Sequence, residues 1–184
     1  MTTVISGDTG VSQVQNNIVS PVKLTQPLTL GTAQNTTSGT SIDFTGIPSW
    51  VKRITVMFNG VSTNSTSPIE IRLGTSSGIV SSGYLSHAGF IQGSAVGSNT
   101  SASGLLAAVA GDPSNTLYGP LVISKQSGNL WVSSGVTLRV ASPNYSSTCS
   151  GAISLADNLD RLRITTVNGT DTFDAGSVNI LYEG

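Results

Sequence analysis

Apolar and polar residues alternate along several short segments of this chain. In the segment 50–61, the side chains of Ile54, Val56 and Phe58 fall on one face, and polar ones such as Arg53 fall on the other. A side-chain period of two with a single apolar face is typical of antiparallel sheets that have one solvated side. We therefore predict a strand here, with its apolar face toward a hydrophobic core.

The same alternation recurs in 67–74, 160–167 and 177–184. In 67–74 we expect the charged side chains of Glu70 and Arg72 to point outward to solvent. In the second segment, the arginines at 161 and 163 are expected to point outward in the same way. The pattern predicts that the following side chains point into the core: Ile69, Ile71, Leu73, Leu162, Ile164, Val178, Ile180 and Tyr182.

Weaker alternation predicts further strands at 25–32, 40–44, 119–124, 129–133, 135–141 and 151–156. The segments between strands carry turn chemistry, because Gly, Asn, Ser and Pro accept the backbone angles of tight turns. Among them, Asn168 and Gly169 form a good tight-turn pair. Strands that recur about every ten residues predict an all-β fold, an antiparallel β-sandwich or jelly-roll-like domain. We expect turns at 59–61, 64–68, 126–129 and 167–171.

The chain divides into an N-terminal arm, residues 1–24, and a β-sandwich domain, residues 25–184. Within the domain, the Gly- and Ser-rich segment 75–116 predicts long loops and short strands. Its apolar run 105–110, LLAAVA, is the one place where we expect a helical turn.

The arm has regularly spaced apolar residues among small polar ones. Thr, Ser and Gly make this segment a poor helix, and Pro21 would stop one. An isolated arm cannot bury its apolar side chains, whereas an arm between copies or against a neighbouring protein can. We therefore predict a docking arm that becomes ordered on assembly, with a disordered tail as the alternative. The candidate docking residues are Val4, Val11, Val14 and Ile18.

Composition excludes several classes of function. Only 9% of the 184 residues are charged, against a usual quarter or so, and the net charge is −1. Phosphate contacts need clustered Lys and Arg, so the scattered basic residues argue against nucleic-acid binding. The longest apolar run is far too short to span a membrane, and the N-terminus has no signal-peptide pattern. Synthesis in a cytoplasm is the resulting expectation.

Two stretches, GTSIDFTGIPSWVKRITVMFNGVSTNSTSPIEIRLG (39–74) and LDRLRITTVNGTDTFDAGSVNILYEG (159–184), closely resemble a β-rich module of tailed-bacteriophage virion proteins. That module is often found at the C-terminus of tail fibre proteins, and residues 6–29 resemble the lead-in before it. The resemblance implies a homotrimeric virion component and carries over no enzymatic residues. A long fibre shaft is missing before the β domain, which favours a short fibre or spike, or a decoration on the head or tail.

His87 and Cys149 are the only residues of their types. His87 could act as a base, but no carboxylate lies near it in sequence, so a turn or interface histidine is the favoured interpretation. Cys149 could act as a nucleophile, but a small buried residue at a strand edge is favoured. One Cys and one His also exclude an intrachain disulfide and a structural zinc site.

Asp157 and Asp160 could pair as glycosidase carboxylates, or bind Ca²⁺ together with Asn158. Glycosidases need two carboxylates held across a cleft. Turn formation and ion pairing with Arg161 or Arg163 is the favoured interpretation. Turn capping is likewise expected of two further side chains, Asp171 and Asp174.

Aromatic side chains in loops can stack on sugars, while Asn and Ser supply hydrogen bonds. Core packing is an equally good interpretation of each aromatic residue here, and Trp131 is expected to pack in a strand. The candidate receptor-contact residues, in predicted loops, are Tyr84, His87, Phe90 and Tyr145.

The leading hypothesis is a bacteriophage virion structural protein. It predicts a homotrimeric short fibre or spike, or a capsid decoration protein, that docks to other virion proteins through its arm. A host-surface glycan is a candidate ligand. The alternative hypothesis is a free-standing carbohydrate-binding, lectin-like module. An enzyme is disfavoured by the single His and the sparse carboxylates, and no cofactor, metal, nucleic acid or membrane insertion is expected.

Overall fold

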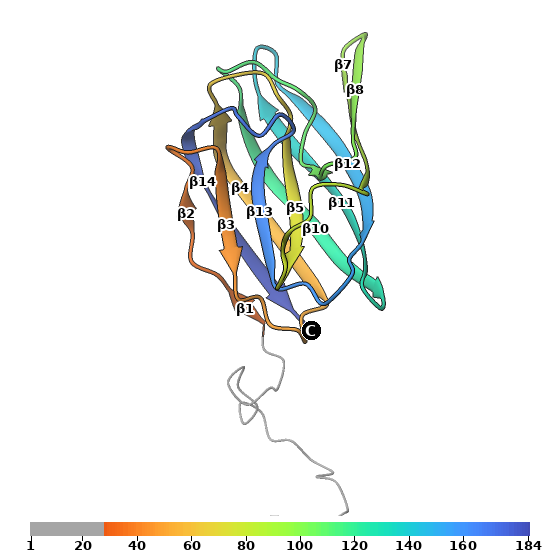
Figure 1. Cartoon of the computed structure of the whole chain (residues 1–184). Coiled ribbons are helices and arrows are strands. Elements are labelled where there is room, and N and C mark those ends of the chain that lie inside the picture. Colours follow the sequence, from red (N-terminus) through yellow and green to blue (C-terminus); the bar gives the residue numbers. More distant parts are fainter. Residues whose placement is uncertain (1–27) are drawn as a thin grey trace, which may run out of the picture.

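A computed structural model describes residues 28–184, so the predicted arm and residues 25–27 lie outside the described residues. The described part contains strands and no helix (Figure 1), which confirms the predicted all-β sandwich. The strands are β1 (Thr29–Leu30), β2 (Gln34–Asn35), β3 (Ser41–Thr45), β4 (Arg53–Thr63), β5 (Ile69–Thr75), β6 (Gly78–Ile79), β7 (Leu85–Gln92), β8 (Ala95–Ser101), β9 (Leu105–Leu106), β10 (Thr116–Ser127), β11 (Leu130–Val140), β12 (Tyr145–Ser154), β13 (Arg161–Thr166) and β14 (Phe173–Glu183).

Two antiparallel sheets of unequal size form the sandwich. The larger sheet has nine strands in the order β1-β14-β4-β10-β11-β12-β7-β8, with β2 also paired to β14. The smaller sheet has five strands in the order β3-β13-β5-β6, with β9 also paired to β5. In Figure 1 the smaller sheet lies over the β14–β4–β10 half of the larger one, and the β7–β8 hairpin stands clear at the far side.

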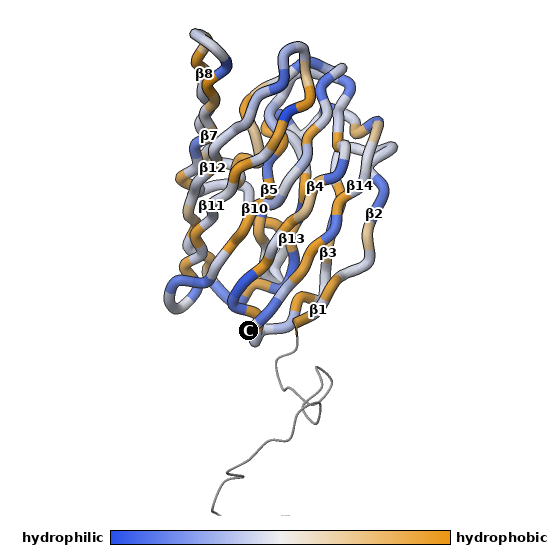
Figure 2. Tube along the Cα trace, turned by 180° about the vertical axis from the view of Figure 1, so that it is seen from behind, coloured by the Kyte–Doolittle hydropathy of each residue, from blue (hydrophilic) through white to orange (hydrophobic). Residues whose placement is uncertain are grey.

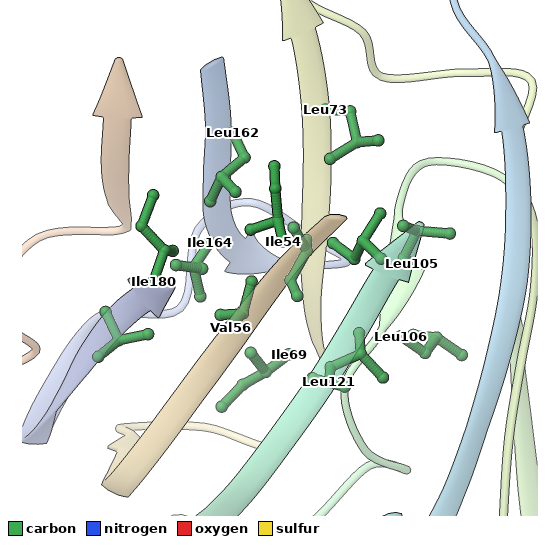
Figure 3. Close-up of a cluster of buried hydrophobic side chains, with 14 of the residues drawn as sticks. Ile54, Val56, Ile69, Leu73, Leu105, Leu106, Leu121, Leu162, Ile164 and Ile180 are labelled. Atoms are coloured by element: carbon green, nitrogen blue, oxygen red, sulfur yellow. The ribbon is translucent and has the colours of Figure 1, made fainter. Parts of the chain in front are cut away.

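The core lies between the two sheets, on the faces that the alternation predicts. On β4, Ile54 and Val56 are fully buried, whereas Arg53, the first residue of the strand, is exposed. Each fully buried Leu, Ile or Val side chain contributes roughly 1.5–3 kcal/mol. Figure 3 shows the centre of this cluster, where side chains from both sheets point toward one another: Ile54, Val56, Ile69, Leu73, Leu105, Leu106, Leu121, Leu162, Ile164 and Ile180.

Several strand and turn boundaries differ from the prediction. The segments 129–133 and 135–141 form one strand, β11, and β12 begins at Tyr145 rather than at 151. The predicted turn at 59–61 is wrong, because these residues continue β4 through a bulge. There Gly60 has a φ of +67° and the pairing with β10 shifts register. The turns at 64–68, 126–129 and 167–171 are confirmed.

The predicted helical turn at 105–110 is also wrong. Residues 105–109, which we call the plug segment, are buried, and the first two of them form β9, which pairs with β5. The Ala107 N–H donates to the Ile69 carbonyl oxygen at 2.9 Å. The plug segment lies over β7, β11 and β12, beyond the reach of the smaller sheet, and its backbone groups bond to β11 and to β5 in place of the internal hydrogen bonds of a helical turn.

Glu70 corrects the expected pattern of β5. It lies on the side of the strand away from the core, as predicted, yet it is completely buried rather than solvated. Its carboxylate accepts hydrogen bonds from Arg72 Nε at 2.7 Å, Ser101 Oγ at 2.7 Å and Ser103 Oγ at 2.9 Å. A Cβ added to Gly104 would lie 2.6 Å from the carboxyl carbon. This arrangement, the Glu70 clip, fixes the end of β8 against β5.

Candidate functional site

The structure describes some of the candidate site residues predicted from the sequence and not others. The four docking residues of the arm, Val4, Val11, Val14 and Ile18, lie outside the described residues, and their role stays a prediction.

Tyr84 is a correction to the set of candidate receptor contacts. It precedes β7 in a loop, as expected, but only 2% of its surface is exposed. Its hydroxyl accepts a hydrogen bond from the Leu73 N–H at 2.7 Å and donates to the Val80 carbonyl at 3.0 Å. Burial raises the pKa of this hydroxyl well above its usual range. Tyr84 therefore holds the segment before β7 onto β5 and is not available to a ligand.

The other three candidates lie on strands rather than in loops, and two of them, His87 and Phe90, border one hollow described below. His87 on β7 is exposed and points away from the smaller sheet. Phe90 on β7 and Tyr145 on β12 point to the opposite side, where their ring centroids lie 4.6 Å apart. The pairing of Phe90 with Tyr145 stiffens the outer part of the hairpin, and His87 remains the exposed member of the set.

The structure contains an apolar surface that was not predicted from the sequence. This surface, which we call the outer face, is the side of β11, β12, β7 and β8 that points away from the smaller sheet. Within residues 28–184, only Leu28 and Leu30 are exposed large hydrophobics that lie elsewhere. Figure 2 shows hydrophobic positions along the hairpin that carries part of this face. Its exposed large hydrophobics are Leu85, Ile91, Val96, Val132, Val136, Leu138 and Val140.

The outer face carries no charged residue. Arg139 is the only charged residue in the sequence of its four strands, and its side chain points inward and is 4% exposed. The outward positions between the apolar ones hold Ser, Thr, Ala, Gly and His87. Burying such a surface in an interface carries a low desolvation cost, since hydroxyl groups lose far less hydration free energy on burial than charges do.

On β11 the usual pattern of a surface strand is inverted. Val132, Val136, Leu138 and Val140, which we call the β11 row, point outward. The inward positions include three polar side chains, Ser133, Thr137 and Arg139.

Most of the inward polar groups have partners on the plug segment. Thr137 Oγ1 donates to the Ala107 carbonyl at 2.7 Å, and Arg139 Nη2 donates to the Val109 carbonyl at 2.9 Å. Burial lowers the pKa of the Arg139 guanidinium. Because the plug segment has no sheet partner over β11, these side chains satisfy its carbonyls. Among residues 28–184, nothing equivalent accounts for the outward β11 row.

A hollow of about 640 Å³ opens in the outer face where β12, β7 and β8 lie side by side. Gly89 occupies an outward position there between Thr148 and Ser98 of the flanking strands and adds no side chain. The volume of the hollow lies in the range of small-ligand sites, roughly 300–1,000 Å³. The hollow is lined by His87, Gly89, Phe90, Ile91, Val96, Gly97, Ser98, Ser146 and Thr148.

The candidate catalytic groups occupy structural positions. Asp160 pairs with Arg161 at 2.7 Å, as predicted, and this hydrogen bond holds the pKa of the Asp160 carboxyl below its usual value. Asp157 accepts a hydrogen bond from the Asn158 N–H at 2.7 Å. Cys149 is buried inside β12, and burial raises the pKa of its thiol to about 11.

Of the second aspartate pair, Asp171 has the expected turn role, whereas Asp174 lies within β14 and bonds to β4, so turn capping is wrong for it. Asp171 accepts hydrogen bonds from the Ser67 N–H at 3.0 Å and from Asn168. Asp174 accepts one from the Ser62 hydroxyl. Across residues 28–184, no three His, Cys, Asp or Glu side chains gather into a metal-binding group. The same part of the chain has no helix of the length and apolarity that crossing a membrane needs.

Comparison of the chain with protein-family models, with curated proteins and with solved structures finds no match.

Proposed function

We propose that this chain is a non-enzymatic structural protein of a bacteriophage particle, a homotrimeric short fibre, spike or decoration protein displayed on the virion surface. The observation that carries the proposal is the outward, uncharged β11 row. Three copies that turn these rows toward a common axis would remove them from water, as cyclic oligomers commonly do. The resemblance of residues 39–74 and 159–184 to virion modules supports the setting, and the arm supplies attachment to other virion proteins.

The oligomeric state tests this proposal directly. Light scattering at micromolar concentration should give three times the 18.8 kDa chain mass. Leu138→Lys should dissociate the trimer, because a lysine in the β11 row cannot be buried without a partner. Leu30→Lys is the matched control, since Leu30 is also exposed but lies on β1. A wild-type monomer overturns the trimer, and a trimeric Leu138→Lys variant overturns the β11 row as its contact.

Attachment is tested separately through the arm. Deletion of residues 1–20 should leave the trimer assembled and abolish its incorporation in a particle-assembly assay. Replacement of Val11, Val14 and Ile18 together by Ser should have the same effect. Normal incorporation of either variant would move the attachment site to the β-sandwich itself.

The alternative function, a free-standing carbohydrate-binding module, is favoured by one observation, the hollow at Gly89. Its lining combines an imidazole, three apolar side chains and several hydroxyls, the mixture that suits the amphipathic face of a sugar ring. A lectin of this kind would bind glycans as a free protein and would not need the arm. A host-surface glycan could also occupy the same hollow on a particle-bound copy.

A further inference from the structure

The sandwich has four sheet edges, and one of them differs from the rest. On the larger sheet, the edge formed by β1 and β2 consists of two-residue strands. On the smaller sheet, β6 also has two residues, and the edge strand β3 carries Asp43, which pairs with Arg163 at 2.7 Å. Short strands and charges are the devices that keep sheet edges from pairing with other chains.

β8 has neither of these protections. It has seven residues, Ala95–Ser101, with no charge and no proline. All seven pair with β7 on one side, and no strand within residues 28–184 pairs with the other side. Figure 1 shows the hairpin standing clear of the rest of the sandwich, so a second strand can approach this edge. Its apolar outward side chain, Val96, is 75% exposed.

The strand is also held in place by side-chain contacts at its base. The Glu70 clip fixes Ser101, and Asn99 Oδ1 accepts a hydrogen bond from the Ala110 N–H at 2.8 Å. The tilted, closely packed rings of Phe90 and Tyr145 support the outer part of the hairpin on its inner side. A pairing strand would therefore meet an ordered edge, and little conformational entropy would be lost on its side of the contact.

We propose that β8 pairs with β8 of a second copy of this chain, antiparallel and about a two-fold axis at Ser98. Ser98 is the midpoint of the strand, so this register gives all seven residues a partner and joins two nine-stranded sheets into one. Val96 then lies opposite the partner's Thr100, a favourable pair of β-branched residues. A self-pairing strand brings like residues together, which a charged edge would oppose and this one does not.

This contact does not rest on the proposed trimer, because it uses a strand edge and not the β11 row. The two contacts also differ in symmetry. A trimer without edge pairing has three copies, edge pairing without the trimer gives two, and both together give an even multiple of three.

A cysteine at the two-fold position tests the pairing in the full-length chain. Directly opposed residues of antiparallel strands have Cα atoms about 4.5–5.5 Å apart, which suits a disulfide. We expect Ser98→Cys to form a covalent dimer rapidly under mild oxidation, seen on a non-reducing gel. Ser76→Cys, exposed in the turn between β5 and β6, is the matched control and should remain monomeric on the gel. The native Cys149 is buried and does not interfere.

The antiparallel register is tested separately with two further variants. Their use also means that a folding defect in Ser98→Cys would not leave the pairing untested. Val96→Cys and Thr100→Cys should each crosslink slowly alone and rapidly when mixed, because these positions face each other across the axis. Crosslinking of Ser98→Cys no faster than Ser76→Cys overturns the pairing. Val96→Cys dimers that form as fast alone as in the mixture overturn the antiparallel register.

The other candidate occupant of this edge is the chain's own N-terminal segment, and the same assay distinguishes it. Deletion of residues 1–20 should leave the Ser98→Cys crosslinking rate unchanged within a factor of two. A rate that rises more than tenfold on deletion would show that the arm covers β8 in the full chain, and would overturn pairing with a second copy.

Discussion

The smaller sheet and the β11 side of the larger sheet present opposite surfaces to their surroundings. On β13, Leu162 and Ile164 point into the core, and Arg161 and Arg163 point outward into ion pairs with aspartates. On β11, polar and charged side chains point inward and the β11 row points outward. One protein therefore contains both the ordinary pattern of a solvated sheet and its inverse.

The difference shows that alternation marks a strand but does not say which face is the solvated one. On the smaller sheet, the other side of the strand is water, so charges are stable there. Under β11 lies the plug segment, whose carbonyls need donors, and Thr137 and Arg139 supply them. Thr137 Oγ1 and Arg139 Nη2 thus find partners within one copy, whereas the outward apolar side chains of the β11 row stay exposed, and this asymmetry is the basis of the proposed assembly.

The largest effect is expected from the same substitution on the two faces of this region. Leu105→Ala removes a fully buried side chain of the plug segment and should lower the free energy of unfolding by about 2–5 kcal/mol. Leu138→Ala removes a side chain of the β11 row that is 40% exposed, and should change the free energy of unfolding of a dissociated chain by less than about 0.5 kcal/mol. Denaturant titration at submicromolar concentration measures both.

A loss of more than about 2 kcal/mol in Leu138→Ala under those conditions would mean that the outward leucine already packs within one copy. The comparison between the two faces would then fail. Repeating both titrations at high protein concentration sharpens it, because only Leu138→Ala should become more destabilising once the copies associate.

A smaller effect is expected where the two carboxylates of the smaller sheet are compared. Glu70→Gln keeps the size of the side chain and loses the charge-assisted bonds of the buried clip, so it should cost about 1.5–3 kcal/mol. Asp43→Asn breaks an exposed pair and should cost at most about 1 kcal/mol. Thermal unfolding compares the two variants. Equal costs would contradict the distinction between a clip that fixes β8 and a solvated surface pair.

The fold could be predicted from the sequence where one face meets water and the other meets the core. The alternation in β4, β13 and β14 correctly gave strands and buried residues, because a core on one side and solvent on the other is the condition under which period-two patterning is informative. It failed for residues 105–110, whose continuous apolar run fits a helix or a buried strand equally well. Only the space left open by the smaller sheet decides between them.

The candidate site could be predicted only in part. His87 was found because it is the single histidine, and its exposure agrees with a surface role. Tyr84 was misplaced, since nothing local indicates that its hydroxyl reaches the backbone of β5. The β11 row is visible in the sequence as three valines and a leucine in alternation, interrupted by Ser134, but the direction of that face depends on the plug segment. The hollow at Gly89 depends on pairing among three strands and has no local signal.

The pH dependence of stability tests whether solvent is excluded from the inner side of β12, where Cys149 is buried. Burial raises the pKa of the Cys149 thiol to about 11, above its value of about 8.5 in an unfolded chain. Unfolding between these values releases a proton, so this contribution to stability is complete below about pH 8.5 and is lost as the pH rises toward 11. This contribution should fall by about 3 kcal/mol in wild type and be absent in Cys149→Ala. Parallel pH slopes of the two proteins in denaturant titrations would show that solvent reaches the thiol.

The smallest effect on stability is expected at the hollow, and it separates the two proposed functions. The backbone at Gly89 is ordinary strand. A Cβ added there would lie 3.2 Å from His87 Cε1, the end of a side chain that can move, and 3.7 Å from the Gly97 carbonyl oxygen. Gly89→Val should therefore fill the hollow and change the free energy of unfolding by less than about 0.5 kcal/mol. Ser154→Val is the matched control, an exposed position at the end of β12 that belongs neither to the hollow nor to the β11 row.

The same two variants separate the proposed functions. If the chain is an assembly protein, both variants should form the wild-type oligomer and join particles normally. If calorimetry with simple pyranosides shows binding that Gly89→Val abolishes and Ser154→Val preserves, the hollow is a sugar site. Should the variant also assemble normally, sugar binding and assembly would belong to different parts of one outer face.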